Sequence, residues 1–192
     1  MKNPFSQTFT LAAASLTGHA SNVTGASWTI GTATAGDGLA HHVTIRNDAA
    51  VDHSAKTITL SGVDADGNAI SETLVAPGAS AIVTSTKAFK SLGSAIPSAT
   101  IGADTFDIGW AATGFTPFVE CRNFGTASVA VFLESGTVNF GIQHCYTSDL
   151  KAFNAETGKT ASAYHEYSAP VYAVRAAINS HTSGVITLQV LD

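Results

Sequence analysis

The sequence predicts an all-β protein made of two small β-sandwich domains, an immunoglobulin-like one followed by a jelly-roll-like one. Three observations lead to this prediction. Short β-branched runs alternate apolar and polar residues with a period of two, which is typical of half-buried strands. Gly, Asp, Asn and Pro residues separate these runs and provide the turns. No segment sustains the period of about 3.6 residues that marks an amphipathic helix.

Residues 1–22 are expected to form an extended N-terminal arm. They imitate a secretory signal peptide only faintly, because Gln7, Thr8 and Thr10 interrupt the apolar run. An arm of this kind can add its apolar side chains to a neighbouring subunit. The residues expected to make these contacts are Phe5, Phe9, Leu11 and Leu16.

The first sandwich domain is predicted over residues 23–112. Short strand candidates lie at residues 27–30 and 42–46, and an antiparallel meander follows over residues 57–110. At residues 64–68 the sequence DADGN supplies a turn, because Asp and Asn tolerate positive φ and Gly adopts it without steric cost. Regular alternation of short strands and turns is typical of an antiparallel sandwich.

The second sandwich domain is predicted over residues 113–192. Residues 111–117 are small, contain Gly and Pro and have no period, so they form the best linker between the domains. Residues 129–133 are a continuous apolar run, which predicts a strand buried on both faces. Residues 137–146 alternate, which predicts a strand with one buried face.

The end of the chain is predicted to form a hairpin. Residues 174–179 and 186–190 both alternate, and the sequence HTSG at residues 181–184 is placed to turn between them. Residues 147–169 are less regular, so a long loop with a short helical turn is expected there.

Charge is scarce in this chain. Only 12% of the 192 residues are charged, about half the usual share, and Ser, Thr, Ala and Gly take their place. Sheet faces rich in hydroxyl groups and surfaces covered by protein partners both fit this composition. The net charge is −5 and the nine Lys and Arg residues form no run, so we expect no direct nucleic-acid binding. No apolar stretch approaches ~18 residues, so we expect no membrane insertion.

The motifs of catalysis and cofactor binding are missing from the sequence. Asp64 and Asp66 resemble the opening of a calcium-binding loop, but Val75 stands at the twelfth position, where such a loop needs Glu. The adjacent His41 and His42 would point to opposite faces of a strand, so they cannot share a metal. No zinc motif, nucleophile elbow or phosphate-binding loop is present. We therefore expect no enzyme activity, no cofactor and no metal.

The two cysteines, Cys121 and Cys145, are too few for a disulfide scaffold. Sequence spacing leaves two alternatives open, a single bridge between them or two buried small apolar side chains. We expect the second, because no other feature of the sequence supports a bridge.

Four segments carry the most specific patterns in the chain. They are DADGNAISETLVAPG at residues 64–78, TSTKAFKSLGSA at 84–95, ATIGADTFDIGW at 99–110 and VYAVRAAINSHTSGVITLQVLD at 171–192. They resemble a widespread family of small β-rich structural proteins of tailed bacteriophages, whose members have a similar turn, a strand of the form STKxFKxV and a closing Gly-Trp or Gly-Thr. The resemblance covers residues 57–110 and 169–191 and contains no catalytic motif.

The resemblance implies a virion structural protein that is made in the host cytoplasm. We expect a capsid decoration (cement) protein on the capsid surface, with the major capsid protein and copies of itself, as a homo-oligomer and in particular a trimer, as partners. Decoration is preferred to a fibre because the chain is short and lacks a coiled coil and shaft repeats. One alternative is a tail, collar or head–tail junction component. Another is a host-surface carbohydrate-binding module, for which the candidate aromatic residues are Trp28, Trp110, Tyr164 and Tyr167.

Overall fold

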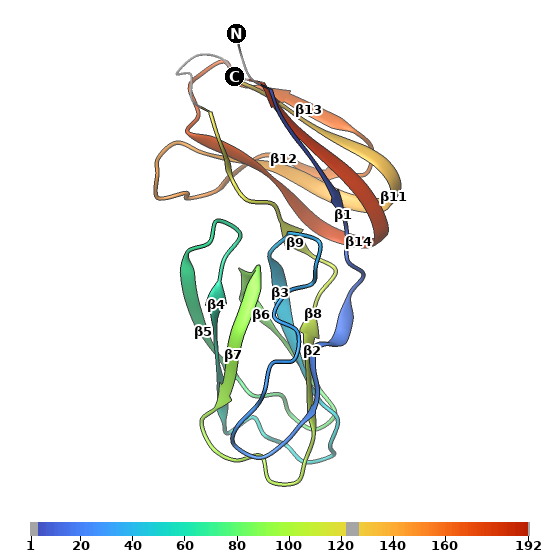
Figure 1. The fold of residues 1–192 in the computed structure, drawn as a ribbon, viewed down its shortest axis with the longest axis vertical. Coiled ribbons are helices and arrows are strands. Elements are labelled where there is room, and N and C mark those ends of the chain that lie inside the picture. Colours follow the sequence, from blue (N-terminus) through green and yellow to red (C-terminus); the bar gives the residue numbers. More distant parts are fainter. Residues whose placement is uncertain (1–3, 122–126, 192) are drawn as a thin grey trace. The chain divides into compact units, whose positions relative to one another are not determined.

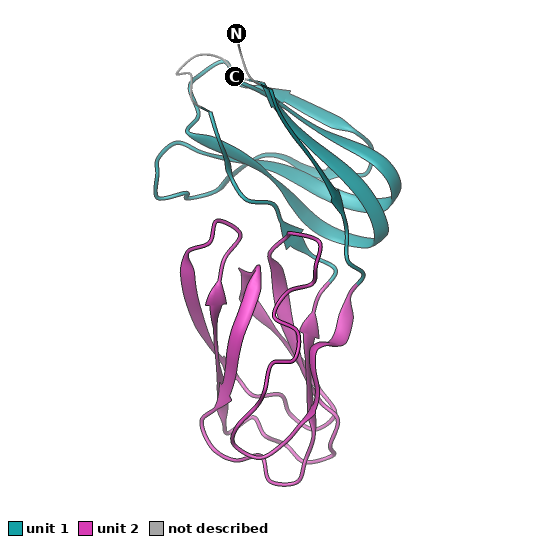
Figure 2. Ribbon diagram, in the orientation of Figure 1, with its two compact units in different colours: residues 1–13, 112–192 teal, residues 14–111 magenta. Residues whose placement is uncertain are grey.

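A computed structural model describes residues 4–121 and 127–191 of the chain. Fourteen β-strands and no helix occur in these ranges, so the predicted all-β class is confirmed. The described part of the chain accordingly holds no helix long and apolar enough to cross a membrane. The chain folds into two compact units, which Figure 2 colours separately. Unit 2 is residues 14–111, and unit 1 combines residues 1–13 with residues 112–192.

Unit 2 contains two antiparallel sheets (Figure 1). Its strands are β2 (Ser15–Val23), β3 (His41–Asn47), β4 (Thr57–Val63), β5 (Ala69–Val75), β6 (Ile82–Phe89), β7 (Ser91–Pro97) and β8 (Phe106–Trp110). One sheet has four strands in the order β2–β8–β3–β6, and the other has three strands in the order β5–β4–β7. The strand predictions at the start of the meander are therefore confirmed, because β4 and β5 flank the predicted turn. The strand predicted at residues 42–46 is confirmed within β3, but the one predicted at residues 27–30 is wrong, because these residues form no strand.

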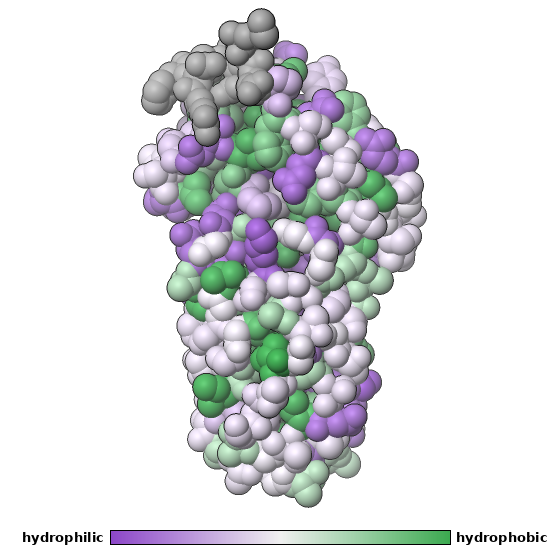
Figure 3. Space-filling view, in the orientation of Figure 1, coloured by the Kyte–Doolittle hydropathy of each residue, from purple (hydrophilic) through white to green (hydrophobic). Residues whose placement is uncertain are grey.

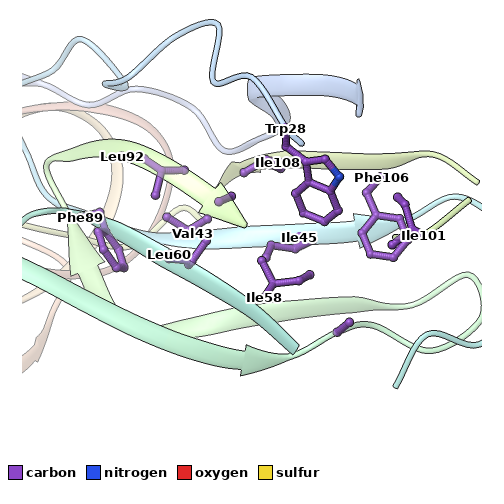
Figure 4. Packing of buried hydrophobic residues seen from close by; sticks show 12 residues of the cluster. Trp28, Val43, Ile45, Ile58, Leu60, Phe89, Leu92, Ile101, Phe106 and Ile108 are labelled. Carbon is purple, nitrogen blue, oxygen red and sulfur yellow. The ribbon is translucent and has the colours of Figure 1, made fainter. Parts of the chain in front are cut away.

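The alternation of apolar residues places the core of unit 2 between its two sheets. Val43 and Ile45 of β3 point inward and are fully buried. Ile58 and Leu60 of β4 belong to the same cluster from the other sheet, as Figure 4 shows. Burying such a side chain contributes about 1.5–3 kcal/mol, so the alternation decides which face of each strand turns inward. The cluster also contains Trp28, Phe89, Leu92, Ile101, Phe106 and Ile108.

The turn predicted at residues 64–68 is confirmed, and it joins β4 to β5. The Asp64 carboxylate accepts hydrogen bonds from the backbone amides of Asp66 and Asn68, each at 2.9 Å. Gly67 has a φ of 85°, which a glycine adopts without steric cost. The Asp64 side chain is thus occupied by the turn itself, which accounts for the Asp-rich sequence.

Unit 1 is built around two long strands. Its strands are β1 (Phe5–Thr10), β9 (Gly114–Phe115), β10 (Val119–Glu120), β11 (Ser128–Cys145), β12 (Phe153–Lys159), β13 (Ala163–Glu166) and β14 (Ala173–Leu191). All belong to one sheet with the order β1–β14–β11–β12, in which β9 and β10 also pair with β14 and β13 also pairs with β11. Figure 1 shows β11 and β14 curving back along their length. Buried side chains occur in both halves of the two strands, whereas the middle of β11 is exposed.

The hairpin predicted near the C-terminus is wrong, because β14 runs without interruption through residues 181–184. These residues pair with β11 across irregularities of register, and Gly184 lies opposite Gly136. Gly136 has a φ of 85°, and a Cβ at this position would collide with the Ser183 carbonyl oxygen. The glycines therefore allow a bend within a strand pair instead of a chain reversal.

Two further expectations for unit 1 are corrected. Phe132 is 39% exposed, so the apolar run at residues 129–133 lies in a strand with only one buried face. The loop expected at residues 147–169 contains strands β12 and β13. Both strands add to an outer side of β11, where mostly polar sequences such as that of β12 are tolerated.

The residues of the expected N-terminal arm are divided between the two units. β1 pairs with the end of β14, and Phe9 of β1 lies opposite Ile186 and is 2% exposed. β2 pairs instead with β8 in unit 2. Burial of Phe9 stabilises the pairing of β1 with β14, because the ring is removed from water when the two strands pair. Unit 2 begins at residue 14, earlier than the expected start at residue 23, and it is inserted between β1 and β9 of unit 1.

Candidate functional site

The outer face of the sheet β5–β4–β7 is the candidate interaction site. The alternation that turns Ile58 and Leu60 of β4 inward turns the residues between them outward. Cross-strand neighbours continue this face, since Thr59 lies opposite Thr73 on β5 and Ile96 on β7. We call this surface the hydroxyl face: Thr57, Thr59, Ser61 and Val63 of β4, Ala69, Ser71, Thr73 and Val75 of β5, and Ser94 and Ile96 of β7.

The hydroxyl face carries no charged side chain, and four of its six hydroxyl groups pair across the strands. The Oγ1 atoms of Thr59 and Thr73 lie 3.1 Å apart. The Oγ atoms of Ser61 and Ser71 lie 3.4 Å apart. Hydroxyl groups paired in this way keep a partner when another protein covers them, so the desolvation cost of burial is small. Covering a face of lysine or glutamate side chains would be far more costly.

Two apolar side chains give the hydroxyl face a driving force for association. Val75 is 58% exposed and Ile96 is 57% exposed, so removing both from water is favourable. In Figure 3 the visible surface of unit 2 is mostly of near-neutral hydropathy with small hydrophobic areas. The hydroxyl face itself carries no Lys or Arg, and a surface without charge is suited to burial against another protein.

Glu72 ties β5 to β6 next to the hydroxyl face. Its carboxylate accepts hydrogen bonds from the backbone amides of Thr86 and Lys87 at 2.9 and 2.8 Å. Burial acts to raise the pKa of Glu72, but the hydrogen bonds from Thr86 and Lys87 outweigh it and hold the pKa below its usual value. Lys87 Nζ donates in turn to the Ser71 carbonyl oxygen at 2.8 Å. The charged groups of Glu72 and Lys87 are therefore both hydrogen-bonded within unit 2.

The four residues expected to mediate association are divided between the two units. Phe9 and Leu11 are 2% and 6% exposed and belong to the interior of unit 1. Phe5 lies opposite Val190 in the pairing of β1 with β14. Leu16 lies in unit 2 and is 37% exposed. The first three thus have a role within unit 1, and contact of any of the four with another subunit stays a prediction.

The adjacent histidines of unit 2, His41 and His42, form hydrogen bonds within the unit. His41 Nε2 lies 2.9 Å from the Asp37 carboxylate, and both side chains are almost fully buried. His42 Nδ1 lies 3.0 Å from the Ser85 carbonyl oxygen, and burial lowers the pKa of His42. Among the residues that the structure describes, no three His, Cys, Asp or Glu side chains are grouped so that they could hold a metal ion.

Cys121 and Cys145 do not form a disulfide, and both are buried. The Cys121 amide donates to the Tyr172 carbonyl oxygen, and Cys145 lies opposite Ala173. The start of β14 and the residue before it therefore lie between the two cysteines. Two strand spacings of about 4.8 Å each exceed the Cα separation that a disulfide allows. The expectation of two buried small side chains is confirmed.

The four aromatic residues considered for carbohydrate binding are divided between the two units. Trp28 and Trp110 are 8% and 9% exposed in unit 2. The Trp28 ring packs against Phe106 with ring centroids 5.4 Å apart. Tyr164 is 74% exposed and Tyr167 is 7% exposed, and both lie in unit 1. Packing in the interior therefore accounts for both tryptophans.

The hydroxyl face is not among the expected sites, although part of its signal is present in the sequence. Thr and Ser occupy the positions that alternate with Ile58 and Leu60, and Ser71 and Thr73 repeat the pattern after the turn. Two such runs joined by a short turn predict one polar sheet face. The addition of β7 depends on pairing between distant segments, which no local pattern predicts.

No family model and no curated protein matches the chain. Among solved structures, the PBSX exported protein XepA aligns over 96% of this chain and 86% of its own, with 8% identity and a TM-score of 0.31. The major capsid protein of bacteriophage PM2 aligns over 97% of this chain and 96% of its own, with 9% identity and a TM-score of 0.26. A structure of infectious bursal disease virus, Gx strain, aligns over 100% and 71%, with 12% identity and a TM-score of 0.23. Scores this low do not show a shared fold, so the assignment of function rests on the chain's own residues.

Proposed function

We propose that this protein is a structural component of a tailed-bacteriophage virion and acts as a capsid decoration (cement) protein. It binds the major capsid protein on the outside of the head shell as a homo-oligomer and bridges neighbouring capsid subunits. The observation that carries this proposal is the hydroxyl face, a sheet surface without charge on which four of the six hydroxyl groups pair with one another. The segments that resemble phage structural proteins supply β5, β8 and β14 and most of β6 and β7.

A decoration protein works through many modest contacts. Full burial of an exposed side chain such as Val75 or Ile96 contributes about 1.5–3 kcal/mol, and the loss of free motion on association opposes it. Repetition of the contact raises the total, because subunits linked in an oligomer engage a symmetric shell together. A homo-oligomer meets this requirement.

The proposal includes no enzyme activity, no cofactor and no nucleic-acid or membrane partner. The carboxylates near the hydroxyl face are engaged within unit 2, Glu72 by backbone amides of β6 and Asp64 by its own turn. A surface with these properties supports protein contact better than chemistry on a substrate.

Removal of the gene tests the proposal on whole particles. Particles without the protein should assemble, but they should release their genome at a lower temperature or under a milder osmotic shock than wild type. Addition of purified protein should restore the wild-type resistance. If the depleted particles withstand heating like wild type but fail to adsorb to cells, the cement role is wrong and a role in receptor binding replaces it.

A charge placed on the hydroxyl face tests where the partner binds. Thr73→Lys should lower binding to depleted particles about tenfold or more, because covering the ammonium group costs more than 1.4 kcal/mol. Thr84→Lys is the matched control, because Thr84 is also exposed on a strand of unit 2 but lies outside the hydroxyl face. Equal binding of the two variants in co-sedimentation would place the contact elsewhere. Melting curves of both variants separate an effect on binding from an effect on folding.

A further inference from the structure

Five aromatic side chains from three strands gather in unit 1. His144 lies near the end of β11 and Tyr146 follows that strand, while Phe153 begins β12. His165 lies in β13, and Tyr167 follows that strand by one residue. We call these five residues the aromatic patch. None of them belongs to the hydroxyl face, which lies in unit 2.

Contacts between the rings hold the aromatic patch together. The His144 ring stacks on Phe153, its partner across β11 and β12, with ring centroids 5.9 Å apart. Tyr146 and Tyr167 each approach the His144 ring in T-shaped geometry, at 4.9 and 5.2 Å. His165 contacts the Tyr167 ring at 4.6 Å. Mutual packing of this kind organises the rings before a ligand arrives, which lowers the entropy lost on binding.

The aromatic patch has an exposed layer and a buried layer. Tyr146 is 56% exposed and Phe153 is 45% exposed. His144 and Tyr167 beneath them are only 8% and 7% exposed. The two exposed rings have centroids 5.7 Å apart and are tilted by 53° to each other, so with the buried rings beneath them they form an angled, largely apolar surface that a ligand can cover.

Two buried polar atoms in the patch, His144 Nδ1 and the Tyr167 hydroxyl, have no hydrogen-bond partner among the described residues. Buried polar groups in proteins are nearly always paired, with protein, water or ligand. Burial raises the pKa of the Tyr167 hydroxyl and lowers the pKa of His144. The phenol therefore keeps its proton and the imidazole is neutral near pH 7, so both suit a neutral polar ligand.

Glu156 of β12 places a carboxylate beside the patch. Its Oε1 lies 3.1 Å from His165 Nδ1, and its Oε2 lies 2.8 Å from Lys159 Nζ. Hydrogen bonds from Lys159 and His165 lower the pKa of Glu156, so its carboxylate is ionised at neutral pH and accepts hydrogen bonds. A ligand that offers hydroxyl donors fits next to this group, whereas a second negative charge would be repelled.

We propose that the aromatic patch is a binding site for a neutral saccharide. One pyranose ring packs the C–H groups of its apolar face on Phe153 and contacts the inclined Tyr146 ring with its edge. Its hydroxyl groups hydrogen-bond with the Glu156 carboxylate. The Tyr167 hydroxyl and His144 Nδ1 are enclosed in the free protein, and they join the site when the exposed Tyr146 ring turns aside for the ligand. Saccharides combine an apolar ring face with closely spaced hydroxyl groups, and the patch offers the complement of both. The inference does not depend on the cement role, because it rests on unit 1 alone.

Titration of the full-length protein with three neutral tetrasaccharides tests the site. Maltotetraose, cellotetraose and chitotetraose are the probes, and ligand-observed NMR is the assay. At least one of them should bind, and both Tyr146→Ala and Phe153→Ala should lower its affinity about tenfold. Tyr167→Phe should also lower the affinity without lowering the melting temperature, because the lost hydroxyl has no partner in the free protein.

Tyr164→Ala is the matched control for the exposed rings. Tyr164 is 74% exposed, and as the strand neighbour of His165 it points to the opposite side of β13. Its removal should leave the affinity unchanged. An absence of binding by all three saccharides, or an equal loss in Tyr164→Ala, would overturn the proposal. If no saccharide binds but Tyr146→Ala weakens binding to depleted phage particles, the patch is a protein contact instead.

Discussion

Replacement of Phe9 by alanine should destabilise unit 1 by about 3–5 kcal/mol. Phe9 is 2% exposed and lies opposite Ile186 in the pairing of β1 with β14. Loss of the ring removes its apolar burial and leaves a cavity, which strands held in a hydrogen-bonded ladder fill only in part. Since β1 is an edge strand, little else holds it against β14 once the ring is gone.

The two units carry separate spectroscopic reporters for this experiment. Both tryptophans, Trp28 and Trp110, lie in unit 2, and all four tyrosines lie in unit 1. Urea unfolding followed by tryptophan fluorescence therefore reports on unit 2, and circular dichroism in the tyrosine bands reports on unit 1. With a slope of about 2 kcal/mol per molar urea, the loss corresponds to a fall of roughly 1.5–2.5 M in the tyrosine-detected midpoint.

Gln7→Ala is the matched control for Phe9→Ala, because Gln7 is exposed on the same strand. It should leave both midpoints unchanged. An unchanged tyrosine-detected midpoint in Phe9→Ala would show that β1 does not complete the sheet of unit 1. An equal fall in both midpoints would show that the two units unfold as one block, which contradicts their description as separate units.

The remaining predictions concern pH, a close strand contact and metal ions. Burial lowers the pKa of His19, His42 and His144 below the ordinary 6.5, so these rings are neutral in the folded protein. As the pH falls through 6.5, the unfolded chain takes up protons before the folded protein does. The contribution of these rings to the free energy of unfolding should therefore be complete above pH 6.5 and be lost below it. A melting temperature that rises on acidification from pH 6.5 would contradict this prediction. Gly109→Ala should lower the free energy of unfolding of unit 2 by about 1–3 kcal/mol, because a Cβ there would collide with the Ser15 carbonyl oxygen. Tryptophan-detected urea unfolding measures this loss, and an unchanged midpoint would refute the close pairing of β2 with β8. A chelator should leave the melting temperature unchanged, and a fall that calcium reverses would show that the Asp-rich turn is a metal site.

The strands and turn at the start of the unit 2 meander could be predicted because their determinants are local. Ile58 and Leu60 alternate with threonine within one short strand, and the alternation alone fixes its buried face. The turn at Asp64 contains its own hydrogen bonds, so its sequence is sufficient to recognise it.

The sheet of unit 1 could not be predicted in the same way, because it depends on pairing between distant segments. Phe9 and Ile186 come from opposite ends of the chain, and no local pattern brings them together. The sequence around Gly184 is typical of a turn and therefore predicts a hairpin there. In the structure Gly184 lies opposite Gly136, and the conformational freedom of glycine allows a bend within the strand pair instead. The aromatic patch combines three strands, so of its residues only Tyr167 could be considered from sequence.

The copy number of the protein in purified virions tests the central claim most directly. Quantitative mass spectrometry against the major capsid protein provides this number. A decoration protein occupies a site that the symmetry of the shell repeats, so we expect hundreds of copies in a fixed ratio to the major capsid protein. About a dozen copies or fewer would place the protein in the tail, the collar or the head–tail junction and would contradict the cement role.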